Sequence, residues 1–307
     1  MATFEDFLKE HPLYESATKV LFENSMLLGI SAQLVYENHG EALGPVADEI
    51  LSFVEHAYGP QHISKYISRV NDLAILQEKF DADPSPATLG DQSAAVDSDA
   101  YALSLLLSII FTNHRFELIR ELSLFLNGVE ERNHVGTLLP IGFGTGYELK
   151  MASEILTGWR IEAYDTDSQM AVKARQLLDF FGIKKDISLG GWFPLHHCPD
   201  AIRGQYDAVV LSEVMEHLVD PARALISLRD SLRDEGRMFV TMAINIAQED
   251  HVFLYPTINS CRRQIQNCRL AVAREWISPQ TIFTLPQDRE GGFKRGNYIA
   301  VLDKQKL

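Results

Sequence analysis

The sequence predicts an α/β fold preceded by an all-α segment. Up to about residue 126, apolar residues such as Leu103, Leu106 and Leu107 recur at the intervals of helices. From about residue 127, short apolar strands alternate with helical segments, which is typical of a parallel sheet with helices on both faces. We therefore expect a helical N-terminal domain over residues 1–126 and an α/β domain over residues 127–307.

Seven strands are expected in the second part. They lie at residues 135–141, 160–164, 187–189, 207–211, 238–242, 270–276 and 297–302. Only a loop joins the last two, so they should form an antiparallel hairpin at the edge of a mostly parallel sheet. Helices are expected at 147–156, after an N-cap at Ser168, and at 222–233 with Gly236 as its end. Residues 81–99, rich in Pro, Ser, Ala and Asp, are interpreted as a loop, with a mobile hinge left open.

Composition limits the partners and the compartment. The 307 residues carry a net charge of -14, so the chain has no general attraction for phosphate backbones or anionic lipids. Nucleic acid is therefore disfavoured as a partner, and no membrane contact is expected. The three cysteines form neither a metal-ligand spacing nor a disulfide framework, which suits a reducing compartment. We expect a soluble cytoplasmic protein, and the sequence leaves a homodimer open.

The stretch LLPIGFGTGYELK, residues 138–150, contains the strongest ligand signal. Gly142, Gly144 and Gly146 follow an apolar strand and precede a helix. Glycine lets the backbone approach a ligand closely, and the helix N-terminus offers free N–H groups. The next strand ends at Asp165, whose carboxylate can accept hydrogen bonds from both hydroxyls of a ribose. This spacing predicts an adenosine-like ligand; a glycine turn without a ligand is the alternative.

The glycine pattern distinguishes between two families. A dehydrogenase would have G-x-G-x-x-G, but Tyr147 stands at that third glycine and Gly146 comes one place early. The loop instead resembles the first motif of class I S-adenosylmethionine-dependent methyltransferases. The segment YDAVVLSEVMEHLVDPARAL, residues 206–225, is similar to their fourth-strand motif, and LRDEGRMFVTM, residues 232–242, resembles their fifth strand. The resemblance covers about residues 135–245 and implies a Rossmann-like fold.

The resemblance also implies which residues bind S-adenosylmethionine. The loop would line the methionine part, Asp165 would hold the ribose, and Thr166 would sit beside the adenine. Trp192 could stack on the base, with a core tryptophan as the alternative, and Ser212 would face the methionine or the methyl group. The implied cofactor-binding residues are Gly142, Phe143, Gly144, Gly146, Asp165, Thr166, Gly191, Trp192 and Ser212.

Pro140 departs from the family pattern. The family commonly has Asp or Glu there, which helps to bind the ammonium group of the cofactor, and proline has neither charge nor N–H. Another carboxylate, with Glu148 and Glu213 as candidates, or backbone carbonyls would have to compensate. Pro140 also keeps open a catalytically silent cofactor-binding module.

A carboxylate and histidine cluster follows the fourth strand. Glu213, Glu216 and His217 stand at i, i+3 and i+4, so a helical turn would put them on one face. Small-RNA 2′-O-methyltransferases use a similar group plus a later histidine to bind a divalent metal, and His251 could supply that imidazole. Contact with the substrate, acid–base chemistry and structural hydrogen bonding are alternatives. A divalent metal is possible but not favoured.

Methyl transfer requires alignment of the acceptor and removal of its proton. His217 and His251 are the candidate bases, because imidazole titrates near neutral pH. Residues 243–267 are expected to form the acceptor wall with Tyr255, Arg262 and Arg263, where an arginine could clamp a carboxylate; a solvated helix face is the alternative. The N-terminal helices are interpreted as a lid.

These expectations combine into one predicted function. The chain should transfer a methyl group from S-adenosylmethionine to an N or O atom of a small molecule. A metal-assisted RNA 2′-O-methyltransferase is the second enzymatic interpretation, disfavoured by the acidic composition.

Overall fold

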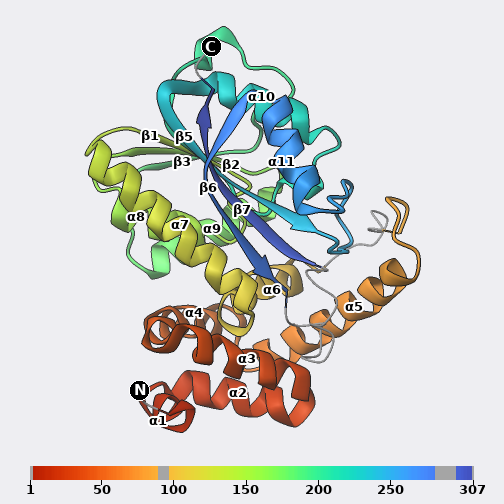
Figure 1. Ribbon diagram of the computed structural model, residues 1–307. Coiled ribbons are helices and arrows are strands. Elements are labelled where there is room, and N and C mark those ends of the chain that lie inside the picture. Colours follow the sequence, from red (N-terminus) through yellow and green to blue (C-terminus); the bar gives the residue numbers. More distant parts are fainter. Residues whose placement is uncertain (1–2, 89–96, 281–294, 306–307) are drawn as a thin grey trace.

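The computed structural model describes residues 3–88, 97–280 and 295–305. The N-terminal part is helical, as predicted. Its helices are α1 (Phe4–Glu10), α2 (Pro12–Asn24), α3 (Met26–His39), α4 (Leu43–Tyr58), α5 (His62–Ala82), α6 (Ser98–Phe111) and α7 (Asn113–Arg132). Helices α1 to α4 gather at one end of the molecule, α6 lies between them and the sheet, and α5 extends to one side (Figure 1).

The boundary expected at residue 126 falls inside α7. This helix runs along the sheet, where the rings of Phe125 and Phe239 lie 5.6 Å apart. One apolar cluster contains buried residues of the N-terminal helices together with residues of one sheet face. The helices are therefore packed continuously onto the α/β part, because α7 supplies apolar side chains to both.

The sheet has the predicted number of strands and the predicted hairpin. The strands are β1 (Thr137–Ile141), β2 (Arg160–Tyr164), β3 (Ile187–Gly190), β4 (Tyr206–Leu211), β5 (Leu232–Ile244), β6 (Leu270–Pro279) and β7 (Gly296–Lys304). Their order is β3-β2-β1-β4-β5-β7-β6, and β7 runs antiparallel to both neighbours. The carboxyl ends of β1, β2 and β4 consequently meet at one edge, where open α/β sheets bind their ligands.

Helices cover both faces of the sheet (Figure 1). The remaining helices are α8 (Tyr147–Ile155), α9 (Ser168–Phe180), α10 (Pro221–Ser231) and α11 (Ile258–Asn267). Neighbouring strand residues point to opposite faces, so Leu138 and Val210 join the cluster under α7 to α9, whereas Leu139 and Val209 join the cluster under α10 and α11. This arrangement confirms that β4 is buried on both faces, as its unbroken apolar run predicts.

Two local predictions were wrong. The N-cap of α9 is Asp167 rather than Ser168, because the Asp167 carboxylate accepts the N–H of Gln169 at 2.8 Å. Helix α10 ends at Ser231, and Gly236 lies inside β5. The register between β4 and β5 shifts there, since Tyr206 pairs with Leu232 but Ala208 pairs with Arg237. Gly236 therefore belongs to a bulge instead of a helix end.

Parts of two predicted loops lie outside the described residues. Helix α5 continues to Ala82, and residues 89–96 of the predicted loop are outside the description, as are residues 281–294 of the loop between β6 and β7. Across the described ranges, no single helix is long and apolar enough to cross a membrane. Helices α6 and α7 reach that length and composition only as a pair, and this pair is bent by 83°.

Candidate active site

The glycine loop after β1 needs its three glycines for steric reasons. Gly142, Gly144 and Gly146 have φ angles of 72°, 49° and 85°, which residues with a Cβ rarely adopt. A Cβ on Gly142 would lie 2.4 Å from Cγ2 of Val214, and one on Gly146 would lie 2.8 Å from the backbone of Ala174. The loop is thus a backbone surface held tightly against its neighbours, with α8 starting directly after Gly146.

Asp165 lies beside this loop, as predicted from its place after β2. One carboxylate oxygen accepts the N–H of Gly144 at 2.9 Å, and the other accepts the N–H of Asp167 at 2.9 Å. Burial raises the pKa of Asp165 above its ordinary value, although these two hydrogen bonds oppose the shift. Backbone groups therefore fix the carboxylate at the edge of the sheet.

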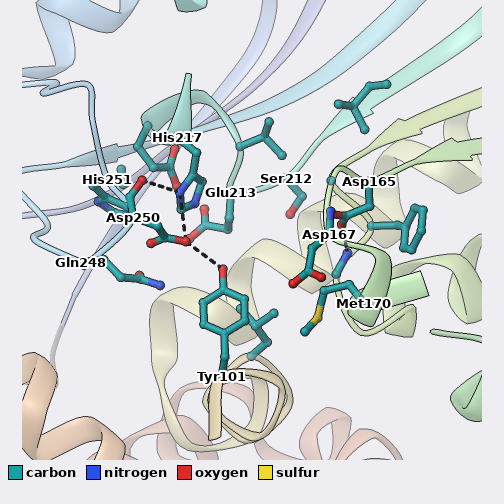
Figure 2. A pocket seen from close by; sticks show the side chains of 18 of the residues that line it. Tyr101, Asp165, Asp167, Met170, Ser212, Glu213, His217, Gln248, Asp250 and His251 are labelled. Carbon is teal, nitrogen blue, oxygen red and sulfur yellow. Dashed lines mark hydrogen bonds and ion pairs between the residues drawn. The ribbon is translucent and has the colours of Figure 1, made fainter. Parts of the chain in front are cut away.

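A cavity of about 800 Å³ lies between this edge and the N-terminal helices. Helices α5, α6 and α7 form its roof, with Tyr66, Tyr101, His114 and Arg115 among the lining residues. The ends of β1, β2 and β4 form its floor. Figure 2 shows a first end with Asp165, Asp167 and Met170, a second end with Tyr101, His217, Gln248, Asp250 and His251, and Ser212 and Glu213 between the two.

Most of the predicted cofactor-binding residues line the cavity. They are Gly142, Phe143, Gly144, Asp165, Thr166, Trp192 and Ser212. Trp192 is 68% exposed, so the alternative of a core tryptophan is wrong. Gly146 supports the loop from behind, and Gly191 is exposed beside Trp192 without lining the cavity.

A buried carboxylate lies close to the unusual Pro140. The Ser212 hydroxyl donates to Glu148 at 2.7 Å, and Glu148 lines the cavity. Burial raises the pKa of Glu148 to about 7, and the Ser212 hydrogen bond and the charge of Arg115 limit the rise. Pro140 and Glu148 line the same small cavity, together with Leu122 and Leu126 of α7. Glu148 thus brings a carboxylate from α8 to the region of Pro140.

Glu213 does not share a helical face with Glu216 and His217, so that prediction was wrong. Glu213 has a φ angle of 55°, and only Met215–His217 form a short 3-10 turn. The Glu213 carboxylate pairs with Arg115 at 3.1 Å and accepts hydrogen bonds from Thr241 and Asn297.

These contacts determine the ionisation of Glu213. Burial opposes its charge, but Arg115 and the Thr241 hydroxyl hold the pKa of Glu213 below its ordinary value. Its left-handed backbone turns the side chain toward α7, which ties the floor of the cavity to the roof.

Glu216, His217 and His251 do come together. One potential ligand atom from each lies within 4.8 Å of the others, and the imidazoles pack edge to face with centroids 4.9 Å apart. Nδ1 of His251 lies 2.8 Å from the Ile246 carbonyl oxygen, and Nδ1 of His217 lies 3.1 Å from that of Asp250. Because carbonyls only accept, each Nδ1 carries a proton, and the Nε2 of each neutral ring retains its lone pair.

Burial and charge set distinct proton affinities in this group. Burial, followed by the charge of Glu213, raises the pKa of Glu216 to about 7. Burial and neighbouring His217 lower the pKa of His251 to about 4, so this ring is neutral. Burial opposes the charge on His217, but the carboxylates of Glu216 and Asp250 outweigh it and raise the His217 pKa. Glu216 therefore exchanges a proton near neutral pH, and His217 holds a proton more tightly than an ordinary imidazole.

The predicted acceptor wall was wrong for three residues. Tyr255 is 1% exposed and its hydroxyl donates to Gln264, Arg262 pairs with Glu275, and Arg263 is exposed. None of the three lines the cavity. Helix α11 packs Cys261 and Ile265 into the second apolar cluster, which leaves its arginines away from the site. Only the first part of the predicted wall, residues 243–252, reaches the cavity.

Sequence reasoning missed the residues of the roof. Tyr101 and Asp250 form a hydrogen bond of 3.3 Å across the cavity, and His114 and Arg115 line it from the start of α7. A signal existed in TNHR, residues 112–115, a polar run between two apolar helical segments that is buried throughout. Such a run predicts a polar site inside the protein.

Comparison with known proteins settles the family. A model of the methyltransferase domain matches residues 111–287, more than half of the chain. The chain belongs to the class I S-adenosylmethionine-dependent methyltransferases. No curated protein sequence matches this methyltransferase significantly. The family match begins at the last residue of α6, so it includes α7 and its polar start.

Solved structures resemble the methyltransferase in fold. The CurJ carbon methyltransferase has a TM-score of 0.53 at 11% identity, over 95% of this chain and 71% of that one. The methyltransferase SibL has a TM-score of 0.46 at 11% identity, over 87% and 76%. The cyclase SpnF has a TM-score of 0.48 at 13% identity, over 60% and 81%. At such identities the likeness concerns the fold alone.

Proposed function

We propose that this methyltransferase moves a methyl group from S-adenosylmethionine to a nitrogen or oxygen atom of a small molecule. The observation that carries the proposal is the roofed cavity with two different ends. Its volume of about 800 Å³ lies within the range of ligand pockets, roughly 300–1,000 Å³. Three helices cover it, which favours a small acceptor over a nucleic acid strand.

The residues at the first end fit an adenosyl cofactor. The glycine loop leaves a cradle that a Cβ would fill, and Asp165 is fixed beside it. In our proposal Asp165 holds the ribose, Thr166 and Trp192 flank the adenine, and Glu148 replaces the carboxylate that Pro140 lacks by binding the ammonium group. When bound, S-adenosylmethionine supplies an electrophilic methyl group on a positively charged sulfur.

We assign proton removal to Glu216 and His217. Both line the second end of the cavity, and their pKa values are raised, Glu216 to about 7. A base whose pKa lies near the working pH is the most effective. In this proposal His251 stays neutral and supports His217 by edge-to-face packing, whereas Glu213 orients Arg115 and takes no proton.

A divalent cation is the alternative use of the same cluster. Glu216, His217 and His251 would hold it, and Glu213 would not, since its oxygens already bind Arg115, Thr241 and Asn297. Such an ion would polarise an acceptor hydroxyl. The RNA 2′-O-methyltransferase interpretation needs this ion and an open basic groove. It is disfavoured because Arg115 is the single Lys or Arg among the described lining residues, and it is paired.

Labelled methyl donor provides the test. The protein is incubated with S-adenosylmethionine carrying a labelled methyl group and with cell extract, and the labelled products are separated by size before mass spectrometry. We expect label in the small-molecule fraction, formed at least about a hundredfold more slowly by His217→Ala. Label confined to RNA or protein would contradict the proposed acceptor class. Cofactor binding with no labelled product would indicate a catalytically silent module.

A further inference from the structure

The second end of the cavity is acidic. Three carboxylates line it, those of Glu216, Glu249 and Asp250, and a fourth, Glu213, borders it from the middle of the cavity. Two of them are neutralised by arginines of the roof, since Glu213 pairs with Arg115 and Glu249 forms a two-pronged ion pair with Arg69 of α5. Glu216 and Asp250 have no arginine or lysine partner among the described residues. They share one imidazole, that of His217.

Both of these carboxylates have an unsatisfied oxygen. Oε2 of Glu216 and Oδ1 of Asp250 are buried and make no hydrogen bond, and the Glu216 residue is only 1% exposed. A buried carboxylate oxygen without a donor is costly, because the lost hydration is not replaced. Both residues line the second end of the cavity, so a ligand that binds there is the remaining source of donors for these carboxylates. Figure 2 shows Asp250 facing Tyr101 across the cavity, next to His217.

Helices α5 and α6 line the cavity mainly with apolar and aromatic side chains, those of Tyr66, Val70, Leu73 and Ile109. The hydroxyls of Ser104 and Ser108 on α6 bond to carbonyls of their own helix, whereas the Tyr66 hydroxyl is buried without a partner among the described residues. The hydroxyl of Tyr101 is turned to Asp250 at 3.3 Å. A ligand for this space therefore needs an apolar body on the side of the helices and a cluster of hydrogen-bond donors on the side of Glu216 and Asp250.

We infer that the methyl acceptor is an amine, bound as an ammonium group against Glu216 and Asp250 with its apolar part under α5 and α6. The inference deepens the proposed function and depends on it. An ammonium group has three donors and no acceptor, which matches the two unsatisfied oxygens. An alcohol offers one donor and leaves an oxygen unpaired. A carboxylate or phosphate would meet like charge, because Arg115 is already committed to Glu213.

Methyl transfer to a bound ammonium group requires the loss of one proton from its nitrogen. The bound ammonium group gives one proton to Glu216 or His217, which leaves a neutral nitrogen with a lone pair. That pair forms a new N–C bond to the methyl carbon while the C–S bond breaks, and the sulfur keeps the electrons of the broken bond. The positive charge moves from sulfur to the methylated nitrogen, and the acquired proton passes to solvent after the product leaves.

Matched ligands test the inference. A library is assembled as triplets in which one apolar body carries an amine, a hydroxyl or a carboxylate, such as phenethylamine, phenethyl alcohol and phenylacetate. Binding is measured calorimetrically to the full chain saturated with S-adenosylhomocysteine, in buffer with EDTA. Binding of S-adenosylhomocysteine is measured first, without an acceptor. If it does not bind, the proposed function fails; if it binds, the amine inference is tested separately.

Within the triplets, we expect the amines to bind roughly tenfold or more tightly than the alcohols, and the carboxylates not to bind. Alcohols or carboxylates that bind as tightly as the amines would overturn the inference. Amine binding that is lost in EDTA and restored by excess Mg²⁺ or Zn²⁺ would also overturn it, because a metal ion would then hold the acceptor.

The variant Asp250→Asn tests the charge itself. It keeps the size of the side chain and removes one negative charge, so affinity for the best amine should fall roughly tenfold while S-adenosylhomocysteine affinity is unchanged. Asp234→Asn is the matched control, since Asp234 is fully exposed and outside the cavity lining. Equal amine affinity in both variants would overturn the role of Asp250.

Discussion

The floor of the cavity is formed mainly by backbone groups, and its roof is formed mainly by side chains. The floor presents backbone: a loop with three left-handed glycines and a carboxylate fixed by two N–H groups. The roof presents long side chains from helices, with Tyr101 and Arg115 reaching across to Asp250 and Glu213. Backbone contacts depend little on the identity of the side chains, so they suit a ligand that is common to many enzymes. Side chains can be exchanged by substitution, so they suit a ligand that differs between enzymes. We therefore assign the cofactor to the floor, and to the roof the contacts with the apolar part of the acceptor.

The two walls are nevertheless coupled by ion pairs and hydrogen bonds. Arg69 of α5 holds Glu249, and Gln77 bonds to the backbone of Asn245 and Ala247 in the segment after β5. That segment also carries Asp250 and His251. The roof consequently positions part of the acceptor end, and changes in α5 should alter the acceptor while sparing the cofactor.

The largest effect should come from the floor. Gly142→Ala places a Cβ 2.4 Å from Val214 in a backbone conformation that costs a non-glycine residue about 1–2 kcal/mol. Relief of the clash would displace the loop, so S-adenosylhomocysteine binding should be lost in calorimetric titration. Gly128→Ala in α7 meets nothing within 4 Å and serves as control, with binding retained. Normal binding by Gly142→Ala would mean that the loop does not hold the cofactor.

Removal of the base should separate chemistry from binding. His217→Ala is expected to lower turnover about 10²- to 10⁴-fold, the usual contribution of a general base. Cofactor affinity should change little, because His217 lies at the acceptor end (Figure 2). Single-turnover rates and titration of the same sample measure both quantities. An unchanged rate would exclude His217 from the reaction.

Glu148 should make cofactor binding depend on pH. Its pKa is raised to about 7, so it is protonated below neutral pH and must lose this proton to bind an ammonium group. As the pH is raised toward 7, affinity for S-adenosylhomocysteine should increase by up to about tenfold per pH unit. Above pH 7 the affinity should become constant, because Glu148 is then ionised. Titrations between pH 5.5 and roughly 8.5 measure the curve.

Two variants make this pH dependence specific. Glu148→Gln should flatten the curve, since it has no proton to lose. Ser212→Ala should move the midpoint upward, because the Ser212 hydrogen bond lowers the Glu148 pKa. A curve that is identical in wild type and Glu148→Gln would assign the dependence to another group.

The smallest effect should come from the roof. Tyr101→Phe removes the hydroxyl that donates to Asp250 at 3.3 Å, a contribution of about 0.5–1.5 kcal/mol. The acceptor KM should rise roughly 2- to 10-fold with the cofactor Kd unchanged. Tyr206→Phe is the control, since its hydroxyl donates to Glu162 outside the cavity. If Tyr101→Phe changed the cofactor affinity and left the acceptor KM unchanged, the assignment of the cofactor to the floor and of the acceptor to the roof would be wrong.

The sequence predicts the floor of the cavity better than its roof. The strands, the glycine loop and Asp165 were predictable because each depends on neighbours along the chain. The position of Glu213 was not, because its left-handed backbone is stabilised by Arg115 and Thr241, both distant in sequence. Its conformation therefore depends on contacts between distant parts of the chain, which local sequence patterns do not reveal.

The roof and the acceptor wall failed for the same reason. Helical periodicity predicts which face of α6 is buried, but not that Tyr101 meets Asp250 from another part of the chain. The arginines of α11 were assigned to the acceptor from their position after β5. The packing of Cys261 and Ile265 turns them away from the site, and this contact has no local signature.

A crystal structure with S-adenosylhomocysteine would show directly whether Asp165 holds the cofactor. We expect both ribose hydroxyls within about 3 Å of the Asp165 carboxylate, with the ammonium group next to Glu148 and the sulfur pointing toward His217. A ligand bound elsewhere, or a ribose without contact to Asp165 in an otherwise ordered complex, would contradict this role of Asp165.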